Sequence, residues 1–253
     1  VILRNPLAEP YTLGITGGAS VGAVLAILFP VLQFSWSVFS SVQLFALAGS
    51  FAILMMIYSM ARRPEGIAVY TLLLAGVTLS IISAGAVMFF RYVASPNYLV
   101  QMDRWMMGGL DVIGYRELSA LFPLLFPGLG ILFSCMVELN HLALGEDLAL
   151  GHGVDVPSVY RRVFFGGGLA TAAAVSLSGP IGFVGLIVPH AVRRLSGYDH
   201  RIVLPGSFFL GGALLAVCDT VARTLFAPTE IPVGIITALA GGPLFIRILL
   251  RRG

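Results

Sequence analysis

The sequence is poor in charge and contains no lysine. Charged residues make up 11% of its 253 residues, whereas soluble domains carry about a quarter. So few charges cannot cover a solvated surface, which excludes a soluble enzyme, a nucleic-acid-binding protein and a disordered chain. All fifteen basic residues are arginines, and they stand singly or in pairs between apolar runs. This spacing is typical of membrane-protein loops rather than of a phosphate-binding patch.

Cysteine and metal-binding patterns are also scarce. Cys135 and Cys218 lie in apolar stretches without C-x-x-C spacing, and the four histidines lack H-x-x-x-H or H-E-x-x-H spacing. The sequence therefore predicts no disulfide framework, no metal site and no catalytic residue. Without lysine there is no G-x-x-x-x-G-K-[ST] loop. Any ATP that drives this protein must therefore be bound by another chain.

Long apolar runs dominate the sequence, which is 58% hydrophobic with a mean hydropathy of +0.95. A membrane-spanning helix needs about 20 mostly apolar residues. Eight segments meet or approach that length: 13–33, 38–61, 68–91, 118–139, 163–178, 182–195, 202–225 and 231–250. Their apolar residues are continuous rather than alternating, which favours helices over a β-barrel. We therefore expect one all-α transmembrane domain over residues 1–253, with about eight spanning helices.

The arginines also predict an orientation. If the long polar loop 140–162 lies inside, eleven arginines fall at inner helix ends and four at outer ends. The outer four are Arg91, Arg104, Arg116 and Arg223. The positive-inside rule then places the loop and the C-terminus in the cytoplasm.

Glycine spacing in the first run predicts close helix packing. Gly14, Gly18 and Gly22 recur every four residues, a pattern that lets two membrane helices approach closely. The same packing role is expected for the pairs 211–212 and 241–242, which are both Gly-Gly.

The stretch GPIGFVGLIVPH, residues 179–190, predicts a break in helical structure. Its glycines and prolines loosen the backbone or remove donors; they are Gly179, Pro180, Gly182, Gly185 and Pro189. Irregular backbone at membrane depth persists only where it is buried in protein or lines a cavity. Two interpretations of this segment remain open: a turn that supports the neighbouring helices, and part of the lining of a transport pathway.

Ionisable residues inside the apolar runs are candidates for function or for pairing. Asp219 and Arg223 lie four residues apart on one helix face, and such a pair can neutralise a buried charge. An intramembrane carboxylate is otherwise a functional candidate. We favour the structural pair, and place Glu138 near the inner end of the fourth run.

The loop 140–162 predicts one or two short amphipathic helices outside the bilayer. Their apolar side carries Leu142, Leu144, Leu148 and Leu150, with glycines at 145, 151 and 153. The charges between them are acidic, so anionic lipid is a poor match. A partner protein is the better candidate to cover the apolar side.

Five stretches carry a resemblance to a known family. They are RNPLAEPYTLGITGGASVGA, LALGEDLALGHGV, GPIGFVGLIVPHAVRRLSGYDHRIVLPGS, DTVART and EIPVGIITALAGGPLFIRILLRR. They resemble the FecCD family, the permease subunits of ABC importers for iron-siderophores, haem and cobalamin. The resemblance runs from about Arg4 to the C-terminus, and it does not distinguish the chelates.

The resemblance implies a dimer of permeases with ten spans each in the bacterial inner membrane. Two cytoplasmic ATPases would bind ATP and Mg, and a periplasmic binding protein would deliver the chelate. The permease itself would bind no cofactor and would work by alternating access. The family's first two spans would precede Arg4, so we expect the sequence to be a fragment or a truncated product. Homodimer and pseudo-dimer both remain open.

The resemblance also implies residue roles. The coupling helices that seat in the ATPase would include Leu142, Ala143, Leu144, Gly145, Glu146, Ala149, Gly151 and Gly153. Arg223 would meet acidic residues of the binding protein. Ala68, Val69, Tyr70 and Thr71 would lie at the inner gate, although Val69 and Tyr70 are not the small hydroxyl residues expected there.

Two other classes of function remain as alternatives. Gly- and Pro-broken spans with an intramembrane Asp219 also suit an ion-coupled secondary transporter. However, the sequence shows no two repeated halves, and a secondary transporter would give the polar loop 140–162 no role. An intramembrane enzyme would need two of Asp219, Glu138 and His190 at one depth, and the predicted topology separates them.

Overall fold

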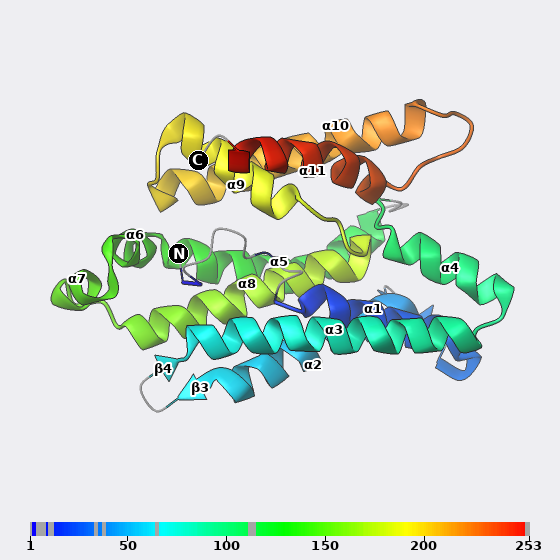
Figure 1. Cartoon of the computed structure of the whole chain (residues 1–253), viewed down its shortest axis with the longest axis horizontal. Helices are drawn as coiled ribbons and strands as arrows, with labels where there is room; N and C mark the ends of the chain where they lie inside the picture. Colours follow the sequence, from blue (N-terminus) through cyan, green and yellow to red (C-terminus); the bar gives the residue numbers. More distant parts are fainter. Residues whose placement is uncertain are drawn as a thin grey trace.

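The fold is an all-α bundle (Figure 1). The structure, a computed structural model, describes residues 2–3, 9, 13–32, 35–36, 39–63, 66–110 and 115–250. Its helices are α1 (Ile15–Leu28), α2 (Ser41–Ala61), α3 (Val69–Val93), α4 (Pro96–Met106), α5 (Tyr115–Ser134), α6 (Met136–Leu144), α7 (Glu146–Gly151), α8 (Val156–Ser178), α9 (Val184–Ser196), α10 (His200–Thr224) and α11 (Val233–Leu250). A 3-10 turn (Pro30–Leu32) and two short hairpins, β1–β2 (Ser35–Trp36, Phe39–Ser40) and β3–β4 (Arg62–Arg63, Gly66–Ile67), join the first helices.

Each of the eight predicted spans contains a helix, although the helices differ in length. Among the described residues, α2, α3 and α10 are long and apolar enough to cross a membrane alone. A fourth candidate is the bent pair Leu121–Ser134 and Met136–Leu144, whose axes differ by 49°. The bend divides the predicted span 118–139, because α5 ends at Ser134 and α6 begins at Met136. The predicted loop 140–162 is correspondingly shorter, since it includes the end of α6 and the start of α8.

The helices form three groups, seen side-on in Figure 1. One contains α1, α2 and α3, the next contains α5 and α8, and the third contains α9, α10 and α11. The pair α6–α7 projects at one end of the bundle, and α4 lies at the other. Helix α4 was not predicted, because Pro96–Met106 is too short and too polar for a span.

Helix α1 forms the centre of the first group and contacts α2 backbone to backbone. A Cβ atom at Gly18 would overlap the carbonyl oxygen of Gly49, and one at Gly22 would overlap that of Phe45. Ser50 of α2 donates to the carbonyl oxygen of Ile15 at 3.3 Å. The predicted role of Gly18 and Gly22 in close packing is therefore confirmed. Gly14 differs, because its neighbour is the carbonyl oxygen of Gly76 in α3, 3.0 Å from a Cβ at that position.

The two Gly-Gly pairs behave differently from each other. A Cβ atom at Gly241 would come within 3.0 Å of Phe183, so close packing holds there. At Gly212, by contrast, a Cβ would meet nothing within 4 Å, and at Gly211 its nearest neighbour is Val188 at 3.9 Å. The expected packing role is therefore wrong for Gly212.

The predicted break lies between α8 and α9, and it is shorter than predicted. Gly179 (φ 65°) ends α8, and α9 begins at Val184, so Gly185 and Pro189 lie inside a helix rather than in the break. Gly179 and Pro180 are buried. The amide of Gly109 donates to the carbonyl oxygen of Ser178 at 2.8 Å. Of the two readings left open, this packing supports a buried turn that holds neighbouring segments.

Gly22→Ala should destabilise the bundle, because its methyl group has no room beside Phe45. Overpacking of this kind costs about 1–3 kcal/mol, which lowers the thermal midpoint by roughly 5 °C. The midpoint can be measured on purified protein in detergent. Gly212→Ala is the matched control and should leave it within about 2 °C. Equal midpoints for the two variants would contradict the packing assignment.

Candidate functional site

The candidate site is the projecting pair α6–α7, which exposes an apolar face. Leu144, Leu148 and Leu150 are 69%, 54% and 56% exposed. Soluble surfaces rarely gather large apolar side chains in this way without a partner. The predicted short helices of this segment are confirmed, and three of the four predicted apolar side chains remain uncovered within the described part of the chain; the fourth, Leu142, is buried.

The opposite face anchors the pair to α8. Leu142 and Ala149 are buried in one cluster with Val154, Val156, Val159 and Tyr160. The residues assigned to coupling thus separate into three sets: Leu142 and Ala149 are buried, Gly145 and Glu146 are half-buried, and Ala143, Leu144, Gly151 and Gly153 are exposed.

Glycine sets the turns on either side of α7. Gly145, which links the two helices, has φ 126° and ψ 151°, and Gly153 has φ 78°. Residues with a Cβ rarely adopt these conformations. A Cβ at either position would meet nothing within 4 Å. Their requirement for glycine is therefore conformational and does not arise from packing.

Polar contacts connect α6 and α7 to α8. The hydroxyl of Tyr160 donates to Glu146, and Arg162 pairs with Glu138 at 3.5 Å. The carboxylate of Asp155 caps α8 by accepting from the amide of Ser158 at 3.2 Å. Hydrogen bonds to charged groups are stronger than neutral ones. Glu146 therefore holds α7 in place as well as lying in the predicted coupling segment.

Asn140 connects α6 to the start of α10. Its amide donates to Asp199 at 2.7 Å, and its oxygen accepts from the backbone amide of His200 at 2.8 Å. Two hydrogen bonds hold the pKa of the Asp199 carboxyl below its usual range: the larger effect comes from the backbone amide of Arg201, and the smaller from the side chain of Asn140. Sequence reasoning missed Asn140, Asp199 and Tyr160, because no local spacing relates positions so far apart.

Two histidines also lie together here. The rings of His141 and His152 stack with centroids 5.1 Å apart. His152 Nδ1 lies 2.7 Å from the carbonyl oxygen of Leu148. Within the described ranges, no three His, Cys, Asp or Glu residues gather as metal ligands. The stack therefore acts as a further contact between α6 and the end of α7.

The arginines separate between the two ends of the bundle, as predicted. The end that carries α6–α7 also carries Arg62, Arg63, Arg161, Arg162, Arg193, Arg194, Arg201 and Arg247, by their places in the elements of Figure 1. Arg91, Arg104 and Arg223 lie at the opposite end. The side chain of Arg116 lies outside the described residues.

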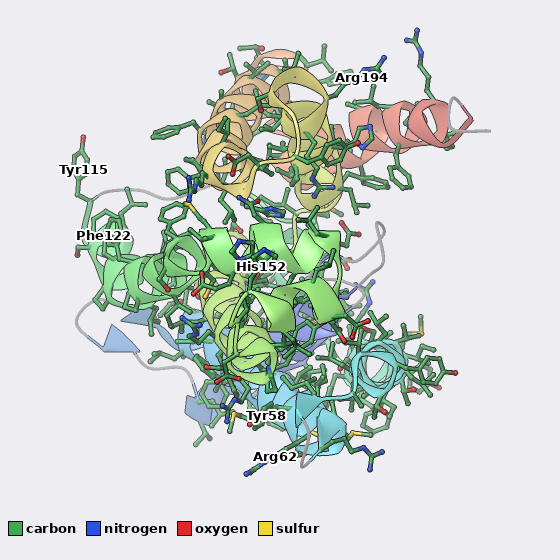
Figure 2. The ribbon with its side chains drawn as sticks, turned by 90° about the vertical axis from the view of Figure 1, so that its left-hand side faces the viewer. Tyr58, Arg62, Tyr115, Phe122, His152 and Arg194 are labelled. Carbon is green, nitrogen blue, oxygen red and sulfur yellow. The ribbon has the colours of Figure 1, made fainter. Side chains whose placement is uncertain are left out.

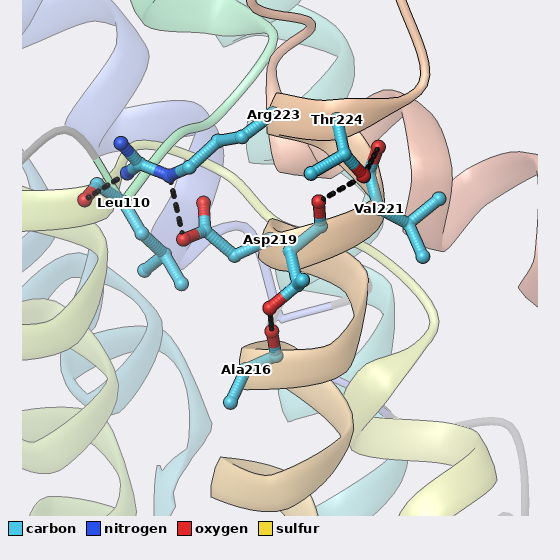
Figure 3. Close-up of polar contacts among 7 residues, drawn as sticks. Leu110, Ala216, Asp219, Val221, Arg223 and Thr224 are labelled. Atoms are coloured by element: carbon cyan, nitrogen blue, oxygen red, sulfur yellow. Dashed lines mark hydrogen bonds and ion pairs between the residues drawn. The ribbon is translucent and has the colours of Figure 1, made fainter.

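The predicted pair Asp219–Arg223 is confirmed at that opposite end. Arg223 Nε donates to Asp219 Oδ2 at 2.8 Å, and its Nη2 lies 3.4 Å from the carbonyl oxygen of Leu110 (Figure 3). Asp219 is half-buried and Arg223 is exposed. The pair neutralises the carboxylate, holds the guanidinium at the surface, and is far from Glu138, which lies in α6.

The segment assigned to the inner gate begins α3 at the α6–α7 end. Ala68 is the residue before α3, and its amide donates to the carbonyl oxygen of Ala61 at 2.9 Å. Val69 packs on the cluster of Tyr160, whereas Tyr70 is 79% exposed. The structure therefore brings one of these residues to the anchoring cluster and leaves another uncovered.

Comparison with known proteins decides the family. The model of the FecCD transport family matches residues 1–251. The chain belongs to the FecCD transport family.

Named relatives of this FecCD chain agree with that assignment. The cobalamin import system permease protein BtuC of Halobacterium salinarum is 42% identical over 249 residues, or 98% of this chain and 65% of that protein. The hemin transport system permease protein HmuU of Yersinia pestis is 38% identical, over 99% of this chain and 75% of that protein. This chain thus spans less than two thirds of the length of the Halobacterium relative.

A solved structure also shares the fold of this FecCD chain. It is an ABC transporter assigned to the metal-chelate type, in an inward-facing conformation. It is 32% identical with a TM-score of 0.88, and the match covers 99% of this chain and 78% of that one. The all-α membrane fold predicted from the apolar runs is therefore confirmed.

Tyr160→Phe should loosen α7 without unfolding the bundle. Losing a hydrogen bond to a carboxylate of this kind speeds local opening by roughly tenfold. Hydrogen exchange of the α7 amides, measured by mass spectrometry, tests this expectation. Tyr198→Phe, an exposed tyrosine at the same end, should leave α7 exchange unchanged. Identical α7 exchange in both variants would show that Glu146 does not depend on Tyr160.

Proposed function

We propose that this chain acts as a transmembrane permease subunit of an ABC importer for a metal chelate or corrinoid. Family membership and the names of the relatives support this function. The single observation in the structure that carries it is the exposed leucine face of α6–α7 at the arginine-rich end. An apolar face outside the membrane needs a protein to cover it, and a cytoplasmic ATPase subunit would do so. The iron-siderophore, haem and cobalamin classes all remain candidates for the cargo.

The proposed mechanism is alternating access driven by a separate ATPase that binds ATP and Mg. Closure of two ATPases would move α6–α7, and the contacts of α6 and α7 with α8 and α10 would carry the movement into the bundle. A second permease copy would form the other wall of the pathway. Of the proposed gate residues Ala68, Val69, Tyr70 and Thr71, Val69 packs on the same anchoring cluster, which suits a gate that responds to α7. The direction of transport would be set by contacts that differ between the two states of the alternating-access cycle.

The proposed orientation places α6–α7 and the C-terminus in the cytoplasm of the bacterial inner membrane. The arginine-rich end supports this placement through the positive-inside rule. The opposite end, with Arg223, would then face an outer binding protein. An ion-coupled carrier has less support, because Asp219 is paired with Arg223 and α6–α7 would lack a partner.

Leu150→Asp should reduce association with the ATPase subunit by more than tenfold, because burying one leucine contributes about 1.5–3 kcal/mol. The measurement is recovery of co-expressed ATPase through a tag on the full-length permease. Leu225→Asp makes the same change at the opposite end and should leave recovery unchanged. Full ATPase recovery with Leu150→Asp would overturn the coupling role of this face.

Arg223→Gln should slow association of the outer binding protein by severalfold at low salt, because exposed charges act mainly on the association rate. The difference should shrink as ionic strength rises. Arg91→Gln is a matched control, since Arg91 is another arginine of that end paired with a carboxylate, Asp103. Surface plasmon resonance of the reconstituted permease can measure both rates. The docking role fails if the two variants slow association equally.

A further inference from the structure

Three arginines line one pocket at the end of α2. The pocket has a volume of about 490 Å³, and its walls include Arg62, Arg63 and Arg161 together with Tyr58 and Pro157. None of the assigned coupling, docking or gate residues lines it. The proposed function therefore does not account for this pocket.

Local structure brings these arginines together from two segments. Arg62 and Arg63 form β3, which pairs with β4 in the register Arg62–Ile67 and Arg63–Gly66. This hairpin packs on the first turn of α8, because a Cβ at Gly66 would lie 3.5 Å from the ring of Pro157. Arg161 is four residues after Pro157, on the same face of α8. The hairpin and α8 thus bring three arginines to the lining of one cavity.

Among the described residues, the three arginines of the pocket are not paired with a carboxylate; Glu65, between β3 and β4 in the sequence, lies outside the described residues. By contrast Arg162, the neighbour of Arg161 in the sequence, pairs with Glu138 at 3.5 Å. Like charges at close range repel one another. An anion in the pocket would relieve this repulsion.

The pocket lies at the boundary of an apolar helix. Arg62 directly follows α2, a candidate membrane span, and Tyr58 stands one turn earlier. Aromatic and basic residues at a span end mark the level of the lipid headgroups. On the same helix Met55, Met56 and Met60 are exposed.

The pocket is also at the periphery of the described bundle. Figure 2 views the end that carries α6–α7, with His152 in the middle and Tyr58 and Arg62 at the lower edge. The side chain of Arg62 points outward, away from the projecting pair. A headgroup at the perimeter therefore suits the pocket better than a protein seated on α6–α7.

We propose that Arg62, Arg63 and Arg161 bind the phosphate group of an anionic lipid in the leaflet at this end of the bundle. Guanidinium groups bind phosphate oxygens in pairs, which suits several arginines around one headgroup. The bound lipid ties the β3–β4 hairpin to α8. The membrane's anionic lipid thereby stabilises the start of α3, which follows that hairpin directly.

The test is a lipid titration of the full-length gene product in detergent, followed by native mass spectrometry. The probes are phosphatidylglycerol, phosphatidylcholine with the same acyl chains, and inorganic phosphate. The pocket variant is Arg62→Gln/Arg63→Gln/Arg161→Gln. The control variant, Arg193→Gln/Arg194→Gln/Arg201→Gln, makes the same charge change at the same end, outside the pocket. If the pocket variant does not fold, Arg161→Gln alone replaces it.

The expected result is that the pocket variant binds phosphatidylglycerol at least about tenfold more weakly, and Arg161→Gln about fivefold more weakly. The control should stay within about twofold, and phosphatidylcholine should bind weakly to all forms. Equal phosphatidylglycerol binding by the pocket variant and wild type would overturn the proposal. Displacement of the lipid by inorganic phosphate would assign the pocket to a soluble anion instead. Loss of ATPase recovery with unchanged lipid binding would assign the arginines to a protein contact.

Discussion

The described bundle depends on one close contact, the backbone crossing of α1 and α2. In a membrane, helices gain little from hydrophobic burial against each other, so van der Waals packing must hold them together. Gly18, Gly22 and Gly49 remove the side chains that would keep the two backbones apart. Helix α1 is consequently almost entirely buried, with α2, α3, α4 and α8 around it. A short helix of 14 residues can thus serve as a core.

Close backbone contacts at glycines also join segments that are distant in sequence. A Cβ at Gly108 would overlap the carbonyl oxygen of Pro180, one at Gly179 that of Trp105, and one at Gly234 that of Met107. The end of α4, the break after α8 and the start of α11 therefore meet backbone to backbone. Irregular backbone is stable within a membrane where neighbouring protein segments bond to its polar groups and shield it from lipid. The break positions α9 against α11 through Phe183 and Gly241.

These rigid contacts contrast with the projecting pair α6–α7. It is held by a few side chains on one face, namely the buried cluster with α8, Tyr160–Glu146 and Asn140 with Asp199 and His200. The other face is apolar and uncovered. An element with this construction can shift as a unit while remaining attached to two helices. The proposed coupling role depends on this ability of α6–α7 to shift as a unit. The unequal distribution of arginines distinguishes this end of the bundle from the other.

The sequence by itself determined the all-α membrane class, the eight apolar helical segments, the separation of arginines between the two ends and the family. These properties follow from composition, local periodicity and long ordered motifs, as does the i, i+4 pair Asp219–Arg223. Only the tertiary structure decided that α6 bends away from α5, that Gly212 faces open space and that Pro189 lies within a helix. It also decided that Arg162 pairs with Glu138 while Arg161 lines a pocket. Such outcomes depend on contacts between residues from 14 to 60 positions apart, such as Tyr160 with Glu146 and Asn140 with His200. No local pattern encodes them, because each partner is set by how whole helices pack.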